Sequence, residues 1–327
     1  MSDTRRIRSA VEPTAGRADM AFFWAGRVVA TLGVIVTAWA ALSTGSMLVH
    51  GHPAYLVLLV LTFAVSLTVA LRSWLTRTVR HRGRTGIRGV LVALSLGVIA
   101  LAWWLVPSSA VEPALSAMDS DTSVTVTETA DQIVLQPTGA VSEVGVFFQP
   151  GARVDARAYA AVLRPLAAAG HVVVIPKQPF GIAFLSTGAF GSARAAHPPV
   201  ERWVVGGHSL GGTVAAMDAQ SFAGASTDPV VGLLFFASYP ANDLSALGAG
   251  VLSISGTNDG LATPDKISAS KASLPADARY LVIEGGVHAF FGDYGPQSGD
   301  GEQSISQDAA RAEISAASVD FVNAFDH

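Results

Sequence analysis

The sequence predicts an α/β fold with a mainly parallel sheet, preceded by three transmembrane helices. Three observations predict it: three long stretches without a charged residue, a later series of short apolar runs separated by helical segments, and a glycine-rich turn around a serine. Half of the 327 residues are hydrophobic, so part of the apolar surface is expected to face lipid. The chain has no cysteine, which excludes disulfides, thiolate metal sites and a cysteine nucleophile.

The first third of the chain is predicted to cross a membrane three times. Residues 28–49, 54–71 and 89–106 contain no Asp, Glu, Lys or Arg, and a bilayer core takes about 20 apolar residues. A cleaved signal peptide is the alternative for the first stretch, because Ala38-Trp39-Ala40 resembles a cleavage site. That stretch begins only after 27 residues and two more follow, so a membrane region over residues 1–106 is the favoured prediction.

The distribution of arginine predicts the orientation of this region. Residues 1–110 hold 11 Arg and 3 acidic residues (net +8), which leaves 10 basic and 22 acidic residues (net −12) for residues 111–327. The loop at residues 50–53 has no Lys or Arg. The segments before the first span and between the second and third spans are basic: Arg5, Arg6, Arg8, Arg17 and Arg27, then Arg72, Arg77, Arg80, Arg82, Arg84 and Arg88. Basic segments stay in the cytoplasm, which predicts a multi-pass protein of the cytoplasmic membrane with a cytoplasmic N-terminus and an extracytoplasmic C-terminal domain. A nucleic-acid role for the arginine-rich loop is the weaker alternative, so no nucleic-acid partner is expected.

Residues 107–122 are rich in small and turn-forming residues and are predicted to be a linker to a domain at 123–327. Eight short runs in that domain are predicted as strands: residues 123–128, 132–136, 144–149, 172–175, 203–205, 230–237, 251–255 and 280–284. The first two alternate like a hairpin, and the others are apolar enough for strands buried on both faces of a parallel sheet.

Helical patterns separate these runs. Asp155 is placed to cap a helix whose Tyr159, Val162, Leu163 and Leu166 share one face, and Gly170 is placed to end it. Strand followed by helix, repeated, predicts a mainly parallel sheet flanked by helices.

The turn Gly207-His208-Ser209-Leu210-Gly211 directly follows the predicted strand at 203–205 and matches G-x-S-x-G. In this motif the serine adopts a strained backbone conformation that projects its hydroxyl above the sheet, and the flanking glycines avoid collisions with strand and helix. The helix that begins near Leu210 directs unpaired N–H groups toward the same point. Ser209 is therefore a candidate nucleophile.

With this turn, residues 123–327 resemble the α/β-hydrolase superfamily, and more narrowly the small bacterial proteins similar to dienelactone hydrolases. The resemblance is carried by the segments 207–212, 149–155 (Gln-Pro-Gly-Ala-Arg-Val-Asp) and 285–292 (Gly-Gly-Val-His-Ala-Phe-Phe-Gly). Dienelactone hydrolases use Cys where this chain has Ser209, so the resemblance does not carry over their substrate.

A serine hydroxyl needs an imidazole to take its proton, and the imidazole needs a carboxylate to orient it. Asp259 directly follows the predicted strand at 251–255, and His288 follows the one at 280–284, which is the order expected of this fold. Asp243, after the preceding strand, is the alternative acid. His171 and His197 precede their strands, at the wrong end of a parallel sheet.

The reaction also needs donors for the oxyanion. One is expected to be the backbone N–H of Leu210, directly after the nucleophile. The resemblance places the second at Ala152, in the loop after the strand at 144–149, with Gly151 as the alternative; Pro150 has no N–H.

Together these residues predict a membrane-anchored serine hydrolase of the carboxylesterase type. Its expected substrate is a small-molecule or lipid ester, and no cofactor or metal is expected. Two alternatives stay open: an acyltransferase acting on envelope lipid or glycan, and a catalytically silent, membrane-anchored binding module. The apolar segment 178–200 is either a wall or lid over the acyl pocket or an ordinary surface helix.

Overall fold

The computed structural model describes residues 16–76 and 85–326 and divides the chain into two compact units. The helix unit comprises Met1–Ser43 and Val57–Trp104, and the sheet unit comprises Thr44–Leu56 and Leu105–His327. Seven of the arginines that predict the orientation lie outside the described residues: Arg5, Arg6, Arg8, Arg77, Arg80, Arg82 and Arg84.

In the described part of the helix unit, three helices are long and apolar enough to cross a membrane: α1 (Arg17–Thr44), α3 (Pro53–Leu75) and α4 (Thr85–Trp104). Their bounds differ from the apolar stretches because helical hydrogen bonding continues through polar residues. Gly45, with a φ of +56°, ends α1 before residue 49, since its left-handed backbone cannot continue the helix. Arg27 satisfies the last turn of α3, because its guanidinium donates to the carbonyl oxygens of Ser73 and Thr76 at 2.7 to 3.0 Å.

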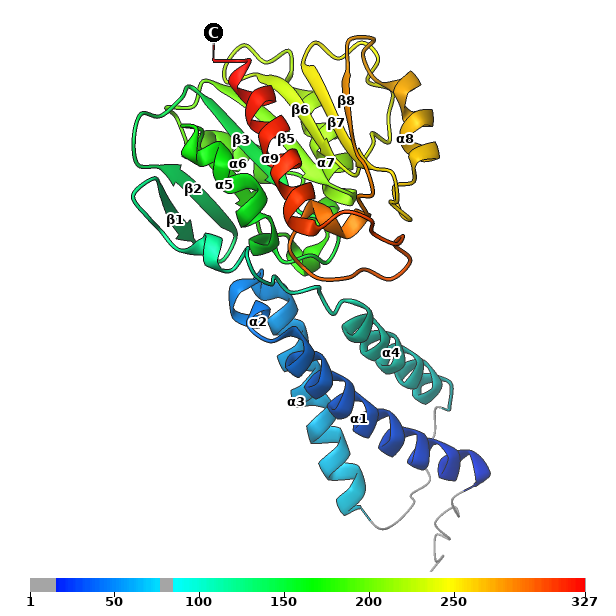
Figure 1. The fold of residues 1–327 in the computed structure, drawn as a ribbon. Helices are drawn as coiled ribbons and strands as arrows, with labels where there is room; N and C mark the ends of the chain where they lie inside the picture. The colour runs from blue at the N-terminus through cyan, green and yellow to red at the C-terminus, as the bar shows by residue number, and fades with distance from the viewer. Residues whose placement is uncertain (1–15, 77–84, 327) are drawn as a thin grey trace, which may run out of the picture. The chain divides into compact units, whose positions relative to one another are not determined.

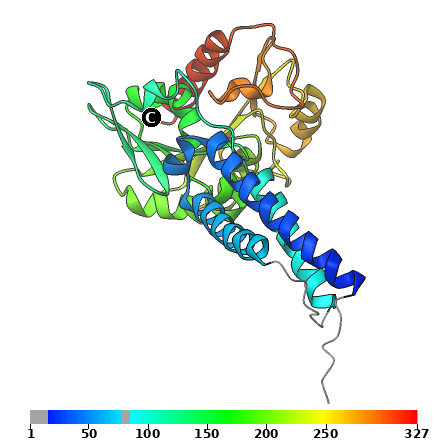
Figure 2. The same ribbon diagram turned by 90° about the horizontal axis from the view of Figure 1, so that it is seen from below.

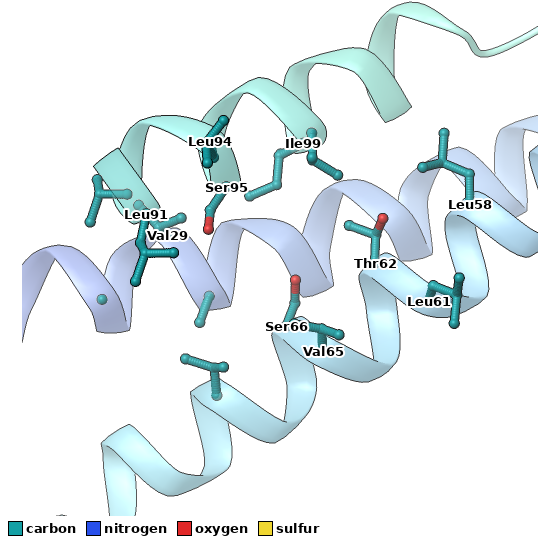
Figure 3. A pocket seen from close by; sticks show the side chains of 15 residues that line it. Val29, Leu58, Leu61, Thr62, Val65, Ser66, Leu91, Leu94, Ser95 and Ile99 are labelled. Carbon is teal, nitrogen blue, oxygen red and sulfur yellow. The ribbon is translucent and has the colours of Figure 1, made fainter. Parts of the chain in front are cut away.

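A groove of about 640 Å³ runs between α1, α3 and α4 (Figure 3). Its lining is apolar apart from the hydroxyls of Thr62, Ser66 and Ser95. None of the site residues predicted from the sequence belongs to it.

The sheet unit is built on eight strands in the order β1-β2-β4-β3-β5-β6-β7-β8. Their bounds are Val124–Glu128, Gln132–Pro137, Val144–Gln149, Val173–Pro176, Arg202–His208, Val230–Phe236, Gly250–Gly256 and Arg279–Ile283, from β1 to β8. β1 and β2 form the antiparallel hairpin, β2 pairs antiparallel with β4, and all other pairs are parallel. The predicted fold class is confirmed. We call the edge at which β3 to β8 end the carboxyl edge.

Helices cover both faces of this sheet, as Figures 1 and 2 show. One face packs against α5 (Ala160–Ala168) and α9 (Gln307–Asn323), the other against α6 (Ala189–Ala196) and α7 (Leu210–Phe222). The predicted apolar face of Tyr159, Val162, Leu163 and Leu166 is buried in the first of these layers. Asp155 caps the short 3-10 helix η2 (Ala156–Tyr159) that leads into α5, and the smaller α8 (Pro264–Ser270) follows β7.

The segment expected as a linker lies against the sheet unit. Ala110 and Ala114 are buried, and Ser108 forms a bridge with Val154 while its backbone also bonds Arg153 and Asp155. Turn-forming composition predicted irregular backbone here, but not the packing.

The turn between α1 and α3 also belongs to the sheet unit and contains the short helix α2 (Met47–His50). Its side chains and backbone bond residues of β1, η2 and the segment 105–122. His50 Nδ1 lies 2.9 Å from Glu128 Oε2, and Arg157 donates to the Ser46 hydroxyl at 3.1 Å. Ser109 donates to the Thr44 carbonyl at 2.9 Å.

Candidate active site

Ser209 stands in a sharp turn between β5 and α7. Its φ of 51° and ψ of −123° lie outside the regions that side-chain-bearing residues usually adopt. Two hydrogen bonds hold this backbone: Ser209 N–H donates to Phe236 O at 3.0 Å, and the Ser238 hydroxyl donates to Ser209 O at 2.6 Å. The strand, turn and helix expected of the G-x-S-x-G motif are therefore present.

The glycines on either side of this turn permit close backbone approaches. A Cβ at Gly207 would lie 2.5 Å from the carbonyl carbon of Gly211. A Cβ at Gly211 would overlap the carbonyl oxygen of Gln149, the last residue of β3. Gly211 thus lets α7 approach the loop that follows β3, which brings Leu210 and the segment 150–152 together at the carboxyl edge.

Asp259 and His288 form a buried pair at the same edge. Asp259 Oδ2 lies 2.8 Å from His288 Nδ1, and both side chains are nearly inaccessible to solvent. The other carboxylate oxygen of Asp259 accepts the N–H groups of Leu261 and Ala262 at 2.8 and 2.7 Å, which fixes the carboxylate in place. The opposite ring nitrogen, His288 Nε2, is buried and has no hydrogen-bond partner among the described residues.

The His288 ring lies beside the serine turn. Its centroid is 4.6 Å from that of His208, the residue before Ser209. The structure thus brings Asp259 and His288 into direct contact and places the His288 ring next to the turn that carries Ser209.

The other predicted candidates lie elsewhere. Asp243 is exposed and accepts the N–H of Ser245 at 2.9 Å, with no bond to a histidine among the described residues. His171 is buried near the start of β4, where its ring bonds Val144 O and Asn323. His197 follows α6, and its ring packs edge-on against Trp203.

Three backbone amides bear on the oxyanion prediction. The N–H groups of Leu210 and Ala152 donate no hydrogen bond within the described part of the chain. The N–H of Gly151 donates to the Tyr159 hydroxyl at 2.8 Å. Gly151, the alternative donor, is therefore already engaged, whereas the other two amides are not.

The family model of the alpha/beta hydrolase family matches residues 145–312, slightly more than half of the chain. The chain belongs to the alpha/beta hydrolase family. The match begins in β3 and ends in α9, so it includes Ser209, Asp259 and His288. No curated protein sequence matches the chain.

Solved structures with similarity to this alpha/beta hydrolase cover about 60% of it. A predicted CIB-like hydrolase from Thermoplasma acidophilum is 16% identical with a TM-score of 0.47, over 62% of this chain and 100% of that one. A thermophilic esterase from Thermogutta terrifontis is 15% identical with a TM-score of 0.43, over 61% and 93%. A dienelactone hydrolase-like protein from Klebsiella pneumoniae is 14% identical with a TM-score of 0.44, over 60% and 96%.

Tyr159 and His208 connect the serine turn of this hydrolase to the loop after β3. The Tyr159 hydroxyl lies 2.8 Å from His208 Nδ1 and also accepts the Gly151 N–H. Burial, and next the neighbouring His288, lower the pKa of His208 well below its usual value, so His208 is neutral. A neutral ring can accept the tyrosine proton at Nδ1. The sequence placed Tyr159 only on an apolar helix face, since spacing reports burial but not the partner of the hydroxyl.

Asp300 is a further residue that sequence reasoning missed. Its carboxylate accepts the N–H groups of His288 at 3.0 Å and Ala289 at 2.8 Å, and that of Gly260 at 3.1 Å. One side chain thus joins the loop of His288 to the loop of Asp259. The sequence around it, Ser-Gly-Asp-Gly, signals a turn but does not reveal which amides the carboxylate meets.

A buried polar cluster lies behind the loop after β3. Gln178 Nε2 donates to Gln149 Oε1 at 2.9 Å and to Pro150 O at 3.2 Å. Gln149 Nε2 and Asp218 Oδ2 of α7 are buried and have no hydrogen-bond partner among the described residues. Burial raises the pKa of Asp218 to about 7, and the polar side chain of Gln149 offsets part of that rise.

The segment 178–200 forms η3 (Pro179–Gly181), η4 (Ala183–Leu185) and α6. The carbonyl of Gly181 accepts the N–H of Arg153 at 2.7 Å, which attaches the segment to the loop after β3. Phe190 and Ala193 of α6 are buried against the sheet, while Phe184 and Leu185 are exposed. Its second half is therefore a surface helix, and its first half adjoins the predicted oxyanion loop.

Proposed function

We propose that this alpha/beta hydrolase is a membrane-anchored serine hydrolase that cleaves a carboxylic ester or a related acyl bond. The observation that carries the proposal is the buried Asp259–His288 pair. Its imidazole ring lies beside that of His208, the residue before Ser209 in the strained turn, and its Nε2 has no hydrogen-bond partner among the described residues. In many serine enzymes without substrate the serine–histidine bond is long and tightens only in the complex, so the unbonded Nε2 is compatible with this role.

In the proposed reaction the Ser209 hydroxyl attacks the acyl carbon while His288 Nε2 takes its proton. The Asp259 carboxylate holds the imidazole by its Nδ1–H and stabilises the imidazolium that forms. The N–H groups of Leu210 and Ala152 donate to the oxyanion of the tetrahedral intermediate. His288 then protonates the leaving alcohol. In the second half of the reaction His288 takes a proton from water, which attacks the acyl carbon, and then returns that proton to Ser209 as the acid product leaves.

Ester and related acyl chemistry is favoured because the groups proposed to act are a hydroxyl, an imidazole, a carboxylate and two amides. Ser209 stands where dienelactone hydrolases have cysteine. We therefore infer an acyl-enzyme intermediate from the resemblance, but not their substrate. Among the described residues, no group of three or more His, Cys, Asp or Glu side chains is arranged to hold a metal ion.

Membrane anchoring is supported by the three apolar helices. Basic residues at the predicted cytoplasmic ends of the spans, Arg27, Arg72 and Arg88 among the described ones, support an extracytoplasmic sheet unit.

Labelling of the detergent-solubilised full-length chain with a fluorophosphonate probe tests the proposal. We expect the folded wild type to be labelled and the equally folded Ser209→Ala variant to remain unlabelled. Absence of labelling in folded wild type, or equal labelling of Ser209→Ala, would favour a catalytically silent binding module. Hydrolysis of p-nitrophenyl esters of graded chain length gives the acyl preference, and an added alcohol distinguishes hydrolysis from transfer by the products formed.

A further inference from the structure

Two segments that lead out of the apolar helices lie against the carboxyl edge of the sheet. The turn 44–56, which joins α1 to α3, bonds Glu128 through His50 and Arg157 through Ser46. The segment after α4 follows, with Ser108 paired to Val154 and the Val111 N–H donating to Asp293 O at 2.9 Å.

All these partners lie at the carboxyl edge. Glu128 ends β1 and is aligned through Ile133 of β2 with Ile175 near the end of β4. Val154 and Arg157 follow the end of β3, and Asp293 follows His288. Ser209, Asp259 and His288 also follow strand ends at this edge.

Hydrogen bonds from His50 to a carboxylate and from a buried arginine to Ser46 hold the turn 44–56 in place. Glu128 is bonded on one side by His50 at 2.9 Å and on the other by Lys177 at 2.8 Å. Burial of Glu128 opposes its charge, but the bonds from Lys177 and His50 outweigh burial and lower its pKa. Arg157, which donates to the Ser46 hydroxyl, also forms a buried ion pair with Asp155 at 2.6 Å. The turn is thus part of the folded sheet unit.

A turn between two membrane-crossing helices lies at the membrane surface, because the helices on both sides place their ends there. The same holds for residue 105, directly after α4. Large apolar side chains are exposed at the same edge: Val111 in the segment after α4, and Phe184 and Leu185 in η4. Exposed apolar side chains on such an edge fit an interfacial position in lipid.

We propose that the carboxyl edge of the sheet lies against the surface of the bilayer, and that the substrate is an ester of a membrane lipid. The second part rests on the proposed hydrolase function. Lipid would reach Ser209 from the bilayer surface past η4, without first dissolving in water. The partner surface is thus the lipid bilayer itself.

Probes at opposite edges of the sheet test the position. Because the chain has no cysteine, Phe184→Cys and Val141→Cys each carry a single bimane label in the full-length chain. Phe184 and Val141 are both 46% exposed, but Val141 precedes β3 at the opposite edge. In proteoliposomes with nitroxide-headgroup lipids we expect at least twofold quenching at 184 and little at 141. Equal quenching, or none at 184, would overturn the proposal; Leu185→Cys repeats the measurement if the 184 variant does not fold.

Comparing an ester in the bilayer with a soluble ester tests whether the substrate is a membrane lipid. We expect proteoliposomes of the wild type to hydrolyse a fluorogenic diacylglycerol in the same bilayer, with Ser209→Ala as the blank. The kcat/KM should be at least tenfold higher than for the same acyl group on a soluble alcohol. Normal hydrolysis of soluble p-nitrophenyl acetate with none of the bilayer ester would overturn the lipid inference alone. Loss of both activities together with absent fluorophosphonate labelling would overturn the hydrolase function itself.

Discussion

The carboxylate of Asp300 accepts the backbone N–H of His288 at 3.0 Å and, through the same oxygen, the N–H of Gly260 at 3.1 Å. Gly260 directly follows Asp259, so one side chain sets the separation of two loops that supply the proposed acid and base. A shift of a fraction of an ångström in either loop changes the direction of the His288 ring toward Ser209, and such shifts are costly in catalysis.

Replacing Asp300 by alanine should therefore lower kcat for p-nitrophenyl acetate by about tenfold or more while KM changes little, because substrate contacts are kept and the base is misplaced. Steady-state kinetics of the solubilised chain measures the split. Asp308→Asn, an exposed carboxylate on α9, is the matched control and should behave as wild type. A rise in KM with unchanged kcat would contradict a positioning role for Asp300.

The two candidate acids make opposite predictions. Asp259→Asn keeps the shape of the side chain but removes the charge that orients His288, and we expect kcat to fall by about 10³ to 10⁴. Asp243→Asn removes an exposed carboxylate bonded to Ser245 and should leave kcat within about twofold of wild type. The pair of variants is compared by ester hydrolysis at pH 8. A large loss in Asp243→Asn beside a near-normal Asp259→Asn would reverse the assignment.

Tyr159→Phe removes one hydroxyl that serves both Gly151 and His208. Two buried polar groups lose their partner, which should cost about 1–3 kcal/mol in the free energy of unfolding. We also expect a reduction in kcat of at least tenfold, since the loop that carries Ala152 is no longer tied to the serine turn. Urea unfolding and ester kinetics of the same sample measure both effects. Tyr280→Phe, on the half-buried outer strand β8, is the control; equal effects in the two variants would argue against this linkage.

Asp218 should make stability depend on pH. Its pKa in the fold is about 7, above the ordinary 3.8, so the folded chain binds more protons than the unfolded chain between these values. The free energy of unfolding is then expected to fall as pH rises from about 4 to 7 and to level off above 7. At about 1.4 kcal/mol for each pKa unit, the decrease is at most about 4 kcal/mol.

Thermal unfolding of the solubilised chain at pH 5.5 and pH 8 measures this effect. Asp218→Asn cannot ionise and should lose this pH dependence, becoming more stable than wild type at pH 8. Asp265→Asn, an exposed carboxylate in the first turn of α8, is the control. An unchanged pH profile in Asp218→Asn would show that Asp218 is ionised in the fold.

The sequence predicted the fold class because apolar runs of the right length mark each strand, and G-x-S-x-G carries its own local geometry. The contact between Asp259 and His288 agrees with their expected order after β7 and β8. The roles of Tyr159, Asp300 and Asp218 were not predicted because they depend on contacts with residues far away in the sequence. The packing of residues 44–56 was not predicted for the same reason: the sequence of a short turn between two apolar helices does not show the ion pair and carboxylate that the turn contacts.

The sheet unit is assembled from two separate stretches of the chain, and this affects how a soluble version of the enzyme can be made. Deleting residues 1–104 would take away Thr44, Ser46 and His50, and so strip bonding partners from Ser109, Arg157 and Glu128. A shortened protein of this kind would expose buried charge to water beside the loop after β3. Biochemical work on the enzyme is therefore better done on the intact chain in detergent or lipid nanodiscs than on a truncated fragment.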